Sequence, residues 1–246
     1  MKSQVLGIEF DGLTIGEAAA RALALTKQPR SAYICTPNPE IVWDAQTDRA
    51  LRGAIAGADM VLPDGIGIVW ASRVLGCPVP ERVAGIDLLM ALLGRFHGRL
   101  FLLGGRPGVA EHAAETIRAQ FPDLTIVGCH DGYFDDPESA YDAVCMAAPE
   151  LILVCMGSPK QELFMVDFAR ILPAGLMIGL GGTLDVLAGD VPRAPERWRR
   201  LGLEWLYRLL REPWRIRRLG CLPRFVWAVF RERIKKRGSE EPQSRD

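Results

Sequence analysis

The sequence lacks the cysteine and histidine patterns of disulfide-linked and zinc-binding proteins. Its six cysteines are scattered, and none forms a Cys-x-x-Cys pair: Cys35, Cys77, Cys129, Cys145, Cys155 and Cys221. Several of them lie inside apolar runs, and the three histidines have no spacing typical of metal ligands. This distribution predicts buried free thiols in a reducing compartment and no metal site.

Long apolar runs are also missing. The longest, residues 175–180, runs into glycines and then Asp185, so it is too short to cross a bilayer. Residues 1–4 lead into a polar-punctuated segment without the apolar core of a signal peptide. With 246 residues, 49% of them hydrophobic, the chain is long enough to bury a full core. We therefore expect a globular cytoplasmic protein.

Two motifs of nucleotide-sugar enzymes are absent. No Asp-x-Asp occurs, so the carboxylate pair that often holds a divalent cation on a nucleotide diphosphate is missing. No Tyr-x-x-x-Lys occurs either, which argues against a short-chain dehydrogenase or an epimerase. If a diphosphate leaves in the reaction, arginines and helix dipoles must stabilise it in place of a metal.

The charge is divided along the chain although its total is zero. Residues 1–192 hold 14 Lys and Arg against 23 Asp and Glu, a net charge of −9. Residues 193–237, the C-terminal arm, hold 15 against 4, a net charge of +11, and residues 238–246 carry −2. We predict a body at 1–192, a basic arm and a disordered tail at 238–246. The arm is expected to meet phospholipid, nucleic acid or a phosphorylated ligand.

Short apolar runs alternate with helical patterns in the body. A short strand is expected at residues 8–10, and further strands at 32–35, 60–62, 100–103, 124–129, 151–156 and 176–180. This order predicts an α/β fold: a Rossmann-like parallel sheet with helices on both faces and with all strand-to-helix loops at one edge.

Asp64 follows the apolar run that ends at Leu62, and Gly65 and Gly67 follow it. An acid in this position lies at the carboxyl end of a strand, where open α/β sheets bind their ligands. Asp64 is therefore a candidate for chemistry, although it can instead cap the next helix. Asn38, after the strand at 32–35, is likewise either a ligand contact or the cap of the next helix.

Three further turns are rich in glycine. Gly104, Gly105 and Gly108 lie between a strand and a helix, where backbone amides suit a phosphate, and residues 157–161 and 181–183 form similar turns. Gln161 either reaches the ligand crevice or lies on the surface. Three amide-rich turns on one edge make a stronger case than any one of them.

The C-terminal arm combines arginine with tryptophan. Helices are predicted at 195–210 and 225–234, and four of the six tryptophans lie in this arm. The composition is typical of a helix in a membrane interface, but a hairpin packed on the body or an oligomer contact remains open. Arg208, Arg211, Arg215 and Arg218 recur at steps of three and four, either to bind phosphate or as a solvated face.

A series of ordered motifs resembles those of one enzyme family. They are Thr36-Pro-Asn-Pro-Glu, Leu62-Pro-Asp-Gly-Ile-Gly, Arg82-Val-Ala-Gly-Ile-Asp, Leu103-Gly-Gly-Arg-Pro-Gly, Gly157-Ser-Pro-Lys-Gln-Glu, Gly181-Gly-Thr-Leu-Asp, Arg193-Ala-Pro-Glu-Arg-Trp and Gly202-Leu-Glu-Trp-Leu-Tyr-Arg. They cover roughly residues 5–225 in unbroken order. On these residues the sequence resembles the WecG/TagA/CpsF glycosyltransferases, family 26.

The resemblance implies an inverting, metal-independent transfer from a UDP-sugar to an undecaprenyl-diphosphate-linked saccharide in the synthesis of cell-surface polysaccharides. It implies the following site: Asp64 as general base, Thr36, Asn38, Arg82 and Gln161 around the donor sugar, and Asp185 at the nucleotide. It also implies that Arg208, Arg215 and Arg218 belong to an appendage that closes over the active site at the membrane and helps to hold the diphosphate.

The transferred sugar is not determined by these residues. N-acetylmannosamine is the first choice, and a UDP-glucose-dependent exopolysaccharide glucosyltransferase is the alternative. A noncatalytic UDP-sugar-binding protein at the membrane is the rival from another class. The expected partners are a UDP-sugar, the lipid-linked acceptor and the anionic inner face of the cell membrane, with no nucleic acid and no cofactor. Whether copies of the chain form a homo-oligomer is left open.

Overall fold

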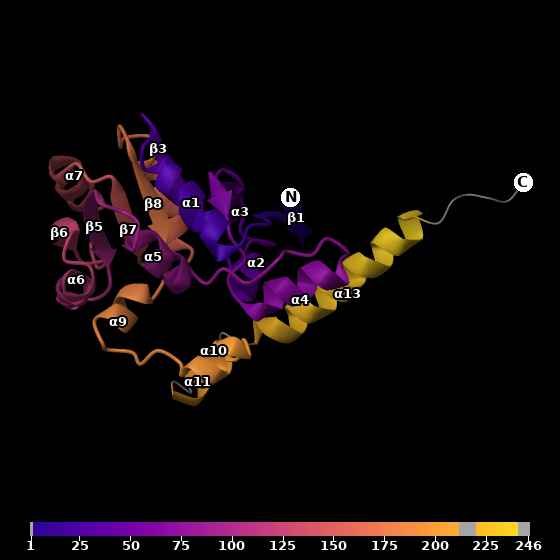
Figure 1. The fold of residues 1–246 in the computed structure, drawn as a ribbon. Coiled ribbons are helices and arrows are strands. Elements are labelled where there is room, and N and C mark those ends of the chain that lie inside the picture. Colours follow the sequence, from indigo (N-terminus) through magenta and orange to yellow (C-terminus); the bar gives the residue numbers. More distant parts are fainter. Residues whose placement is uncertain (1, 212–219, 241–246) are drawn as a thin grey trace, which may run out of the picture.

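The computed structural model describes residues 2–211 and 220–240, which form a layered α/β fold (Figure 1). Its strands are β1 (Lys2–Val5), β2 (Ile8–Asp11), β3 (Ser31–Cys35), β4 (Met60–Val61), β5 (Arg99–Gly104), β6 (Thr125–His130), β7 (Leu151–Cys155) and β8 (Gly175–Gly179). Its helices are α1 (Ile15–Leu25), α2 (Pro39–Asp44), α3 (Arg49–Ala56), α4 (Ile66–Val74), α5 (Gly85–Leu93), α6 (Val109–Gln120), α7 (Glu138–Ala147), α8 (Lys160–Phe168), α9 (Thr183–Leu187), α10 (Glu196–Arg200), α11 (Glu204–Arg211) and α13 (Cys221–Glu240).

The central sheet is parallel throughout. Its strands follow the order β4-β3-β8-β7-β5-β6, and every neighbouring pair runs in the same direction. The carboxyl ends of these strands therefore lie on one edge, together with the loops that follow them. The predicted Rossmann-like α/β class is confirmed.

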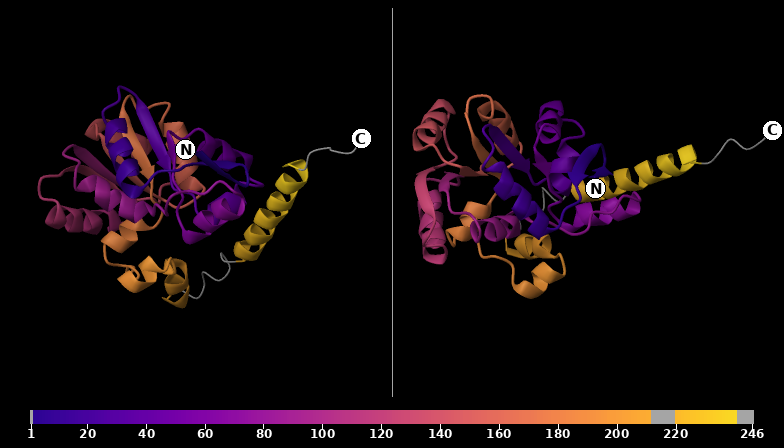
Figure 2. Two further views of the ribbon diagram at one scale, coloured as in Figure 1. Left: turned by 45° about the vertical axis from the view of Figure 1, so that its right-hand side comes forward. Right: turned by 45° about the horizontal axis from the view of Figure 1, so that its top comes forward.

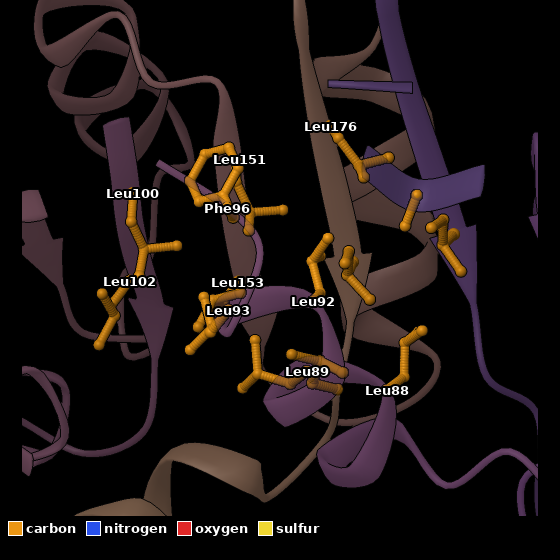
Figure 3. Close-up of a cluster of buried hydrophobic side chains, with 14 of the residues drawn as sticks. Leu88, Leu89, Leu92, Leu93, Phe96, Leu100, Leu102, Leu151, Leu153 and Leu176 are labelled. Carbon is orange, nitrogen blue, oxygen red and sulfur yellow. The ribbon is translucent and has the colours of Figure 1, made fainter. Parts of the chain in front are cut away.

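Successive side chains of a strand point to opposite faces of the sheet, and a parallel sheet that is covered on both sides needs apolar residues on each face. Leu100 and Leu102 of β5 face one layer, where the leucines of α5 pack against the sheet (Figure 3). Phe101 of the same strand faces the other layer, where Phe164 and Phe168 of α8 lie. Helices thus cover both faces, with α1, α5 and α6 on one and α7 and α8 on the other.

Strand β1 and helix α3 are among the elements that were not predicted from the sequence, whereas β2 was expected at residues 8–10. Strands β1 and β2 form a separate antiparallel hairpin, and Leu6 and Gly7 make its two-residue turn, both with positive φ. The polar residues of β1 hid this strand, although Ser3 and Val5 are buried. Helix α3 was also missed, although Asp48 caps it by accepting from the Leu51 N–H at 2.9 Å.

The prediction of one arm helix at 195–210 is wrong in one respect, because the structure has two helices there. Gly202 separates α10 from α11 with φ of +70°, a left-handed conformation that glycine adopts without strain. A β-carbon at Gly202 would lie 3.0 Å from the Ile66 Cβ atom. The break therefore brings the arm against the first turn of α4.

The second arm helix is longer than the predicted 225–234. α13 begins at Cys221 and lies beside α4, and its C-terminal end projects beyond α4 (Figure 2). Phe225 and Val229 are 1% and 0% exposed and join a cluster with Ile41 of α2 and Val69 of α4. Part of the arm thus shares a core with the body. The helix continues to Glu240, into the expected tail 238–246, of which 241–246 lie outside the described residues.

Candidate active site

A cavity of about 570 Å³ lies at the carboxyl edge of the sheet, between the body and the arm. The body contributes Asn38, Pro39, Glu40, Asp64, Gly65, Ile66, Gly67, Trp70, Arg82, Ala84, Gly85, Ile86, Leu180, Gly182 and Thr183. The arm contributes Arg193, Gly202, Glu204, Trp205, Leu209, Cys221, Leu222, Phe225 and Val226. The cavity therefore brings together carboxylates, guanidinium groups and a large apolar wall.

Asp64 is held in this cavity by the backbone on either side of it. Its own N–H donates to the Pro37 carbonyl at 3.3 Å, and the neighbouring Pro63 carbonyl accepts from the Val83 N–H at 2.9 Å. The turn between β4 and α4 is thus tied to the loop after β3 and to the segment before α5. A carboxylate fixed at such a point can accept a proton from a hydroxyl group that enters the cavity.

Asn38 lies in the same cavity and also caps a helix. Its Oδ1 atom accepts from the Ile41 N–H at 3.0 Å, so the capping interpretation is confirmed. The loop that carries it packs on the Asp64 turn, because a β-carbon at Gly67 would lie 2.6 Å from the Pro39 Cγ atom. Glycine at position 67 permits this close approach.

Arg82 lines the cavity as the centre of an ion-pair network. Its guanidinium pairs with Glu204 of the arm and, at 3.4 Å, with Asp87 of α5. Asp87 pairs in turn with Arg193 of the arm. The side chains of Arg82 and Glu204 are 16% and 19% exposed, so the pair is shielded from bulk water. The network joins both parts of the chain at the cavity wall.

Thr36 and Gln161 lie behind the cavity wall, among buried residues, and do not line it. The Thr36 hydroxyl donates to the Gly179 carbonyl at 2.8 Å, and the Gly181 N–H donates to Gln161 Oε1 at 2.9 Å. Both contacts hold the end of β8. Gln161 is 2% exposed, so its interpretation as a surface residue is wrong.

The turn from Gly104 to Gly108 lies elsewhere on the same edge. The Gly105 N–H donates to the Cys155 carbonyl at 3.1 Å, so this amide is used within the protein. A β-carbon at Gly104 would lie 2.2 Å from the same carbonyl oxygen, so close packing on β7 accounts for this glycine. None of Gly104, Gly105 and Gly108 lines the cavity, and the phosphate role expected for them stays a prediction.

Asp185 lies in α9 and does not line the cavity either. It is close to the buried Cys155 thiol at the end of β7. Burial raises the pKa of this thiol to about 12. The Asp185 carboxylate lies next to the cavity wall, since a β-carbon at Gly182, which lines the cavity, would lie 3.4 Å from Asp185 Oδ2. Asp185 thus lies close to both the end of β7 and the cavity wall.

Three arm arginines were expected at the diphosphate. Of these, Arg208 lies in helix α11. Arg215 and Arg218 lie outside the described residues. The structure adds residues that the sequence interpretation did not select, above all Arg193, Glu204 and Trp70. The motif that begins at Arg193 was a signal for the first of these.

Within the ranges that the structure describes, no group of three or more His, Cys, Asp and Glu side chains is placed to hold a metal ion.

Among the described helices, none is both long and apolar enough to cross a membrane.

Comparison with known proteins shows the family to which the chain belongs. Residues 3–239 match the family described as Glycosyl transferase WecG/TagA/CpsF family. A protein of Bacillus spizizenii named N-acetylglucosaminyldiphosphoundecaprenol N-acetyl-beta-D-mannosaminyltransferase is 37% identical over 218 residues, which is 87% of this chain and 84% of that protein. A protein of the same name in Bacillus subtilis is 36% identical over 213 residues, 85% and 83% of the two chains. The chain therefore belongs to the WecG/TagA/CpsF family of glycosyltransferases.

Proposed function

We propose that this glycosyltransferase moves N-acetylmannosamine from a UDP-sugar to an N-acetylglucosaminyl group on undecaprenyl diphosphate. The observation that carries the proposal is the identity of 36–37%, over more than four fifths of the chain, to two enzymes named for that transfer. The sugar named for these relatives was also the first choice from the sequence. A UDP-glucose-dependent transfer is not favoured by either relative.

The reaction is a single displacement at the anomeric carbon, with inversion. Asp64 accepts the proton of the acceptor hydroxyl while the new glycosidic bond forms and the bond to UDP breaks. This role of Asp64 is supported by its position in the cavity wall, after a buried strand and beside the Asn38 loop. Asn38 and Arg82 line the same cavity and are proposed to bind the donor sugar.

Arginines and helix N-termini stabilise the leaving UDP, without a metal. Arg193 suits this role because it lines the cavity and its guanidinium group has the forked donors that bind phosphate. Arg208, Arg215 and Arg218 are proposed to add positive charge from the arm.

The protein is proposed to act at the cytoplasmic face of the cell membrane, attached by the arm. Support comes from the arm's net charge of +11 and from the apolar side chains that α13 exposes. Trp227, Phe230 and Ile234 are 61%, 50% and 71% exposed, and they recur at steps of three and four on the helix. Anionic lipid attracts basic segments by about 1 kcal/mol per Lys or Arg near the surface.

A coupled assay tests this function. Purified full-length protein is mixed with UDP-N-acetylmannosamine and an N-acetylglucosaminyl-diphospho-lipid acceptor, and released UDP and extended lipid are measured. We expect both products in equal amounts, and little product with UDP-glucose in place of the donor. Binding of UDP without any transfer would instead support the noncatalytic alternative. Association into a homo-oligomer stays a prediction.

A further inference from the structure

Glu162 is a buried carboxyl group with no role in the reaction proposed above. It lies in the first turn of α8, its side chain is almost completely inaccessible, and the residue is 1% exposed. Its Oε2 atom is buried without a hydrogen-bond partner in the described residues. Burying a carboxyl group costs free energy, and a group left partly unsatisfied costs more. The presence of this group in the core therefore requires an explanation.

The partner of Glu162 is the side-chain amide of its neighbour. Gln161 Nε2 donates to Glu162 Oε1 at 2.8 Å, and Gln161 Oε1 accepts from the Gly181 N–H at 2.9 Å. A backbone N–H can only donate and a carboxylate can only accept, so both contacts require the same orientation of the amide. Turning the amide over would place donor against donor and acceptor against acceptor.

The amide is also confined by packing. A β-carbon at Gly179 would lie 3.1 Å from Gln161 Nε2, so this amide fills the space that a side chain on β8 would take. The Gly181 N–H that the amide holds belongs to the turn between β8 and α9. Leu180, Gly182 and Thr183 of that turn line the cavity. A chain of two hydrogen bonds thus runs from the buried carboxyl group to the cavity wall.

We propose that Glu162 is a positioning residue for the transferase reaction, which fixes the Gln161 amide and through it the turn at residues 180–183. The torsion that rotates a glutamine amide has a broad energy profile, so the amide needs a second contact to stay in one orientation. Glu162 supplies that contact. The inference deepens the proposed function, because the turn forms part of the proposed donor site.

The test uses Glu162→Leu and Glu162→Gln in the full-length protein. Leucine fills a similar volume but accepts no hydrogen bond, and removing an unsatisfied buried group is not expected to lower stability. Glutamine at position 162 can still present an oxygen to Gln161. Glu111→Leu is the matched control, because Glu111 lies in the first turn of α6, is exposed and does not line the cavity.

Hydrogen exchange of the 180–183 turn is measured first, without substrate, so that the result does not depend on the proposed reaction. We expect Glu162→Leu to speed exchange about five- to tenfold, the effect of roughly one lost hydrogen bond, with an unchanged or higher Tm. Glu162→Gln and Glu111→Leu should leave exchange near that of the parent protein. Unchanged exchange in Glu162→Leu would overturn the inference even if the transfer is confirmed.

Kinetics then test the link to the reaction. We expect kcat/KM for the donor to fall about 10- to 100-fold in Glu162→Leu, as small misplacements in active sites do, and to recover in Glu162→Gln. Gln161→Leu combined with Glu162→Leu should be no worse than Gln161→Leu alone, because the two residues act as one unit. Additive losses would show that Glu162 acts by another route, and the inference would fail.

Discussion

Arg82 of the body and Glu204 of the arm form an ion pair across the cavity, although 122 residues separate them in the chain. Asp87, next to this pair, binds Arg82 and also Arg193 of the arm. Glu204 and Arg193, two arm residues of opposite charge, are therefore held by ion pairs at the cavity wall, where the donor is proposed to bind. Glu204 neutralises part of the positive charge that a diphosphate would meet there.

Removing this carboxylate should strengthen UDP binding. In Glu204→Gln, Arg82 loses its competing partner, and we expect the Kd for UDP at low salt to fall about three- to tenfold, the scale of one partly exposed ion pair. Isothermal titration calorimetry measures this change. Glu196→Gln is the control, since Glu196 pairs with Arg200 on the exposed side of α10. An unchanged or higher Kd in Glu204→Gln would contradict the prediction.

Asp64→Asn should keep the fold and UDP binding but lower turnover by about two to four decades, the usual scale of general acid–base assistance. The amide has nearly the shape of the carboxylate but cannot take the acceptor proton. Steady-state rates and a UDP titration measure the two effects. Asp190→Asn, an exposed change after α9, serves as control. Near-normal turnover in Asp64→Asn would remove Asp64 from the role of base.

Chelation should leave the transferase active. The sequence has no Asp-x-Asp pair, and arginines are proposed to balance the charge of the departing UDP. We expect the same rate with and without EDTA, measured after dialysis against the chelator. Loss of activity that magnesium or manganese restores would show that a cation takes part.

Two aromatic residues on α13 should have separable effects. Phe225 is 1% exposed and Trp227 is 61% exposed. Phe225→Ala should lower the free energy of unfolding by about 3–5 kcal/mol, because it leaves a cavity in the core. Trp227→Ala should change stability by less than about 0.5 kcal/mol but weaken binding to anionic vesicles about tenfold, since one inserted aromatic group is lost.

Chemical denaturation and vesicle sedimentation measure these two effects on both variants. If Trp227→Ala sediments with vesicles as well as the parent protein does, the exposed face of α13 does not insert into lipid. If Phe225→Ala is as stable as the parent, α13 does not share the core of the body.

Stability should depend on pH through Glu162. Burial raises the pKa of this carboxyl group above its ordinary value of 4.5, and the hydrogen bond from Gln161 opposes the shift in part. Because the folded protein holds the proton more tightly than the unfolded chain does, the free energy of unfolding falls as the pH rises from about 4.5 through the folded pKa. Glutamine does not titrate, so Tm of Glu162→Gln should rise relative to the parent over this range. A pH-independent difference in Tm would contradict the raised pKa.

The sequence predicted the parallel sheet well because its strands are short apolar runs that stop at glycine, proline or a polar residue. The position of Asp64 followed from the same pattern. What periodicity cannot reveal is pairing over long distances, such as Arg82 with Glu204, or Gln161 with the Gly181 N–H. The burial of Gln161 depends on such a pairing, so a residue that the sequence placed either in the ligand crevice or on the surface lies among buried residues instead.

The arm was predicted less accurately for a related reason. Its helical pattern continues through Gly202, but this glycine breaks the helix with a positive φ and packs against Ile66 of the body. The polar β1 strand was missed because its partner, β2, decides whether it pairs. In each case tertiary contact overrides the local preference of the chain.

The contact between Gly67 and Pro39 has a consequence for engineering this enzyme. A β-carbon at position 67 would lie 2.6 Å from Pro39 Cγ, and one at position 65 would lie 3.5 Å from Pro39 Cδ. Any larger residue at position 67 must displace Pro39 and, with it, Asn38. The loops at 36–40 and 64–67 must therefore be replaced together. A loop taken from a homologue with another donor preference will fit only if the other loop comes from the same homologue.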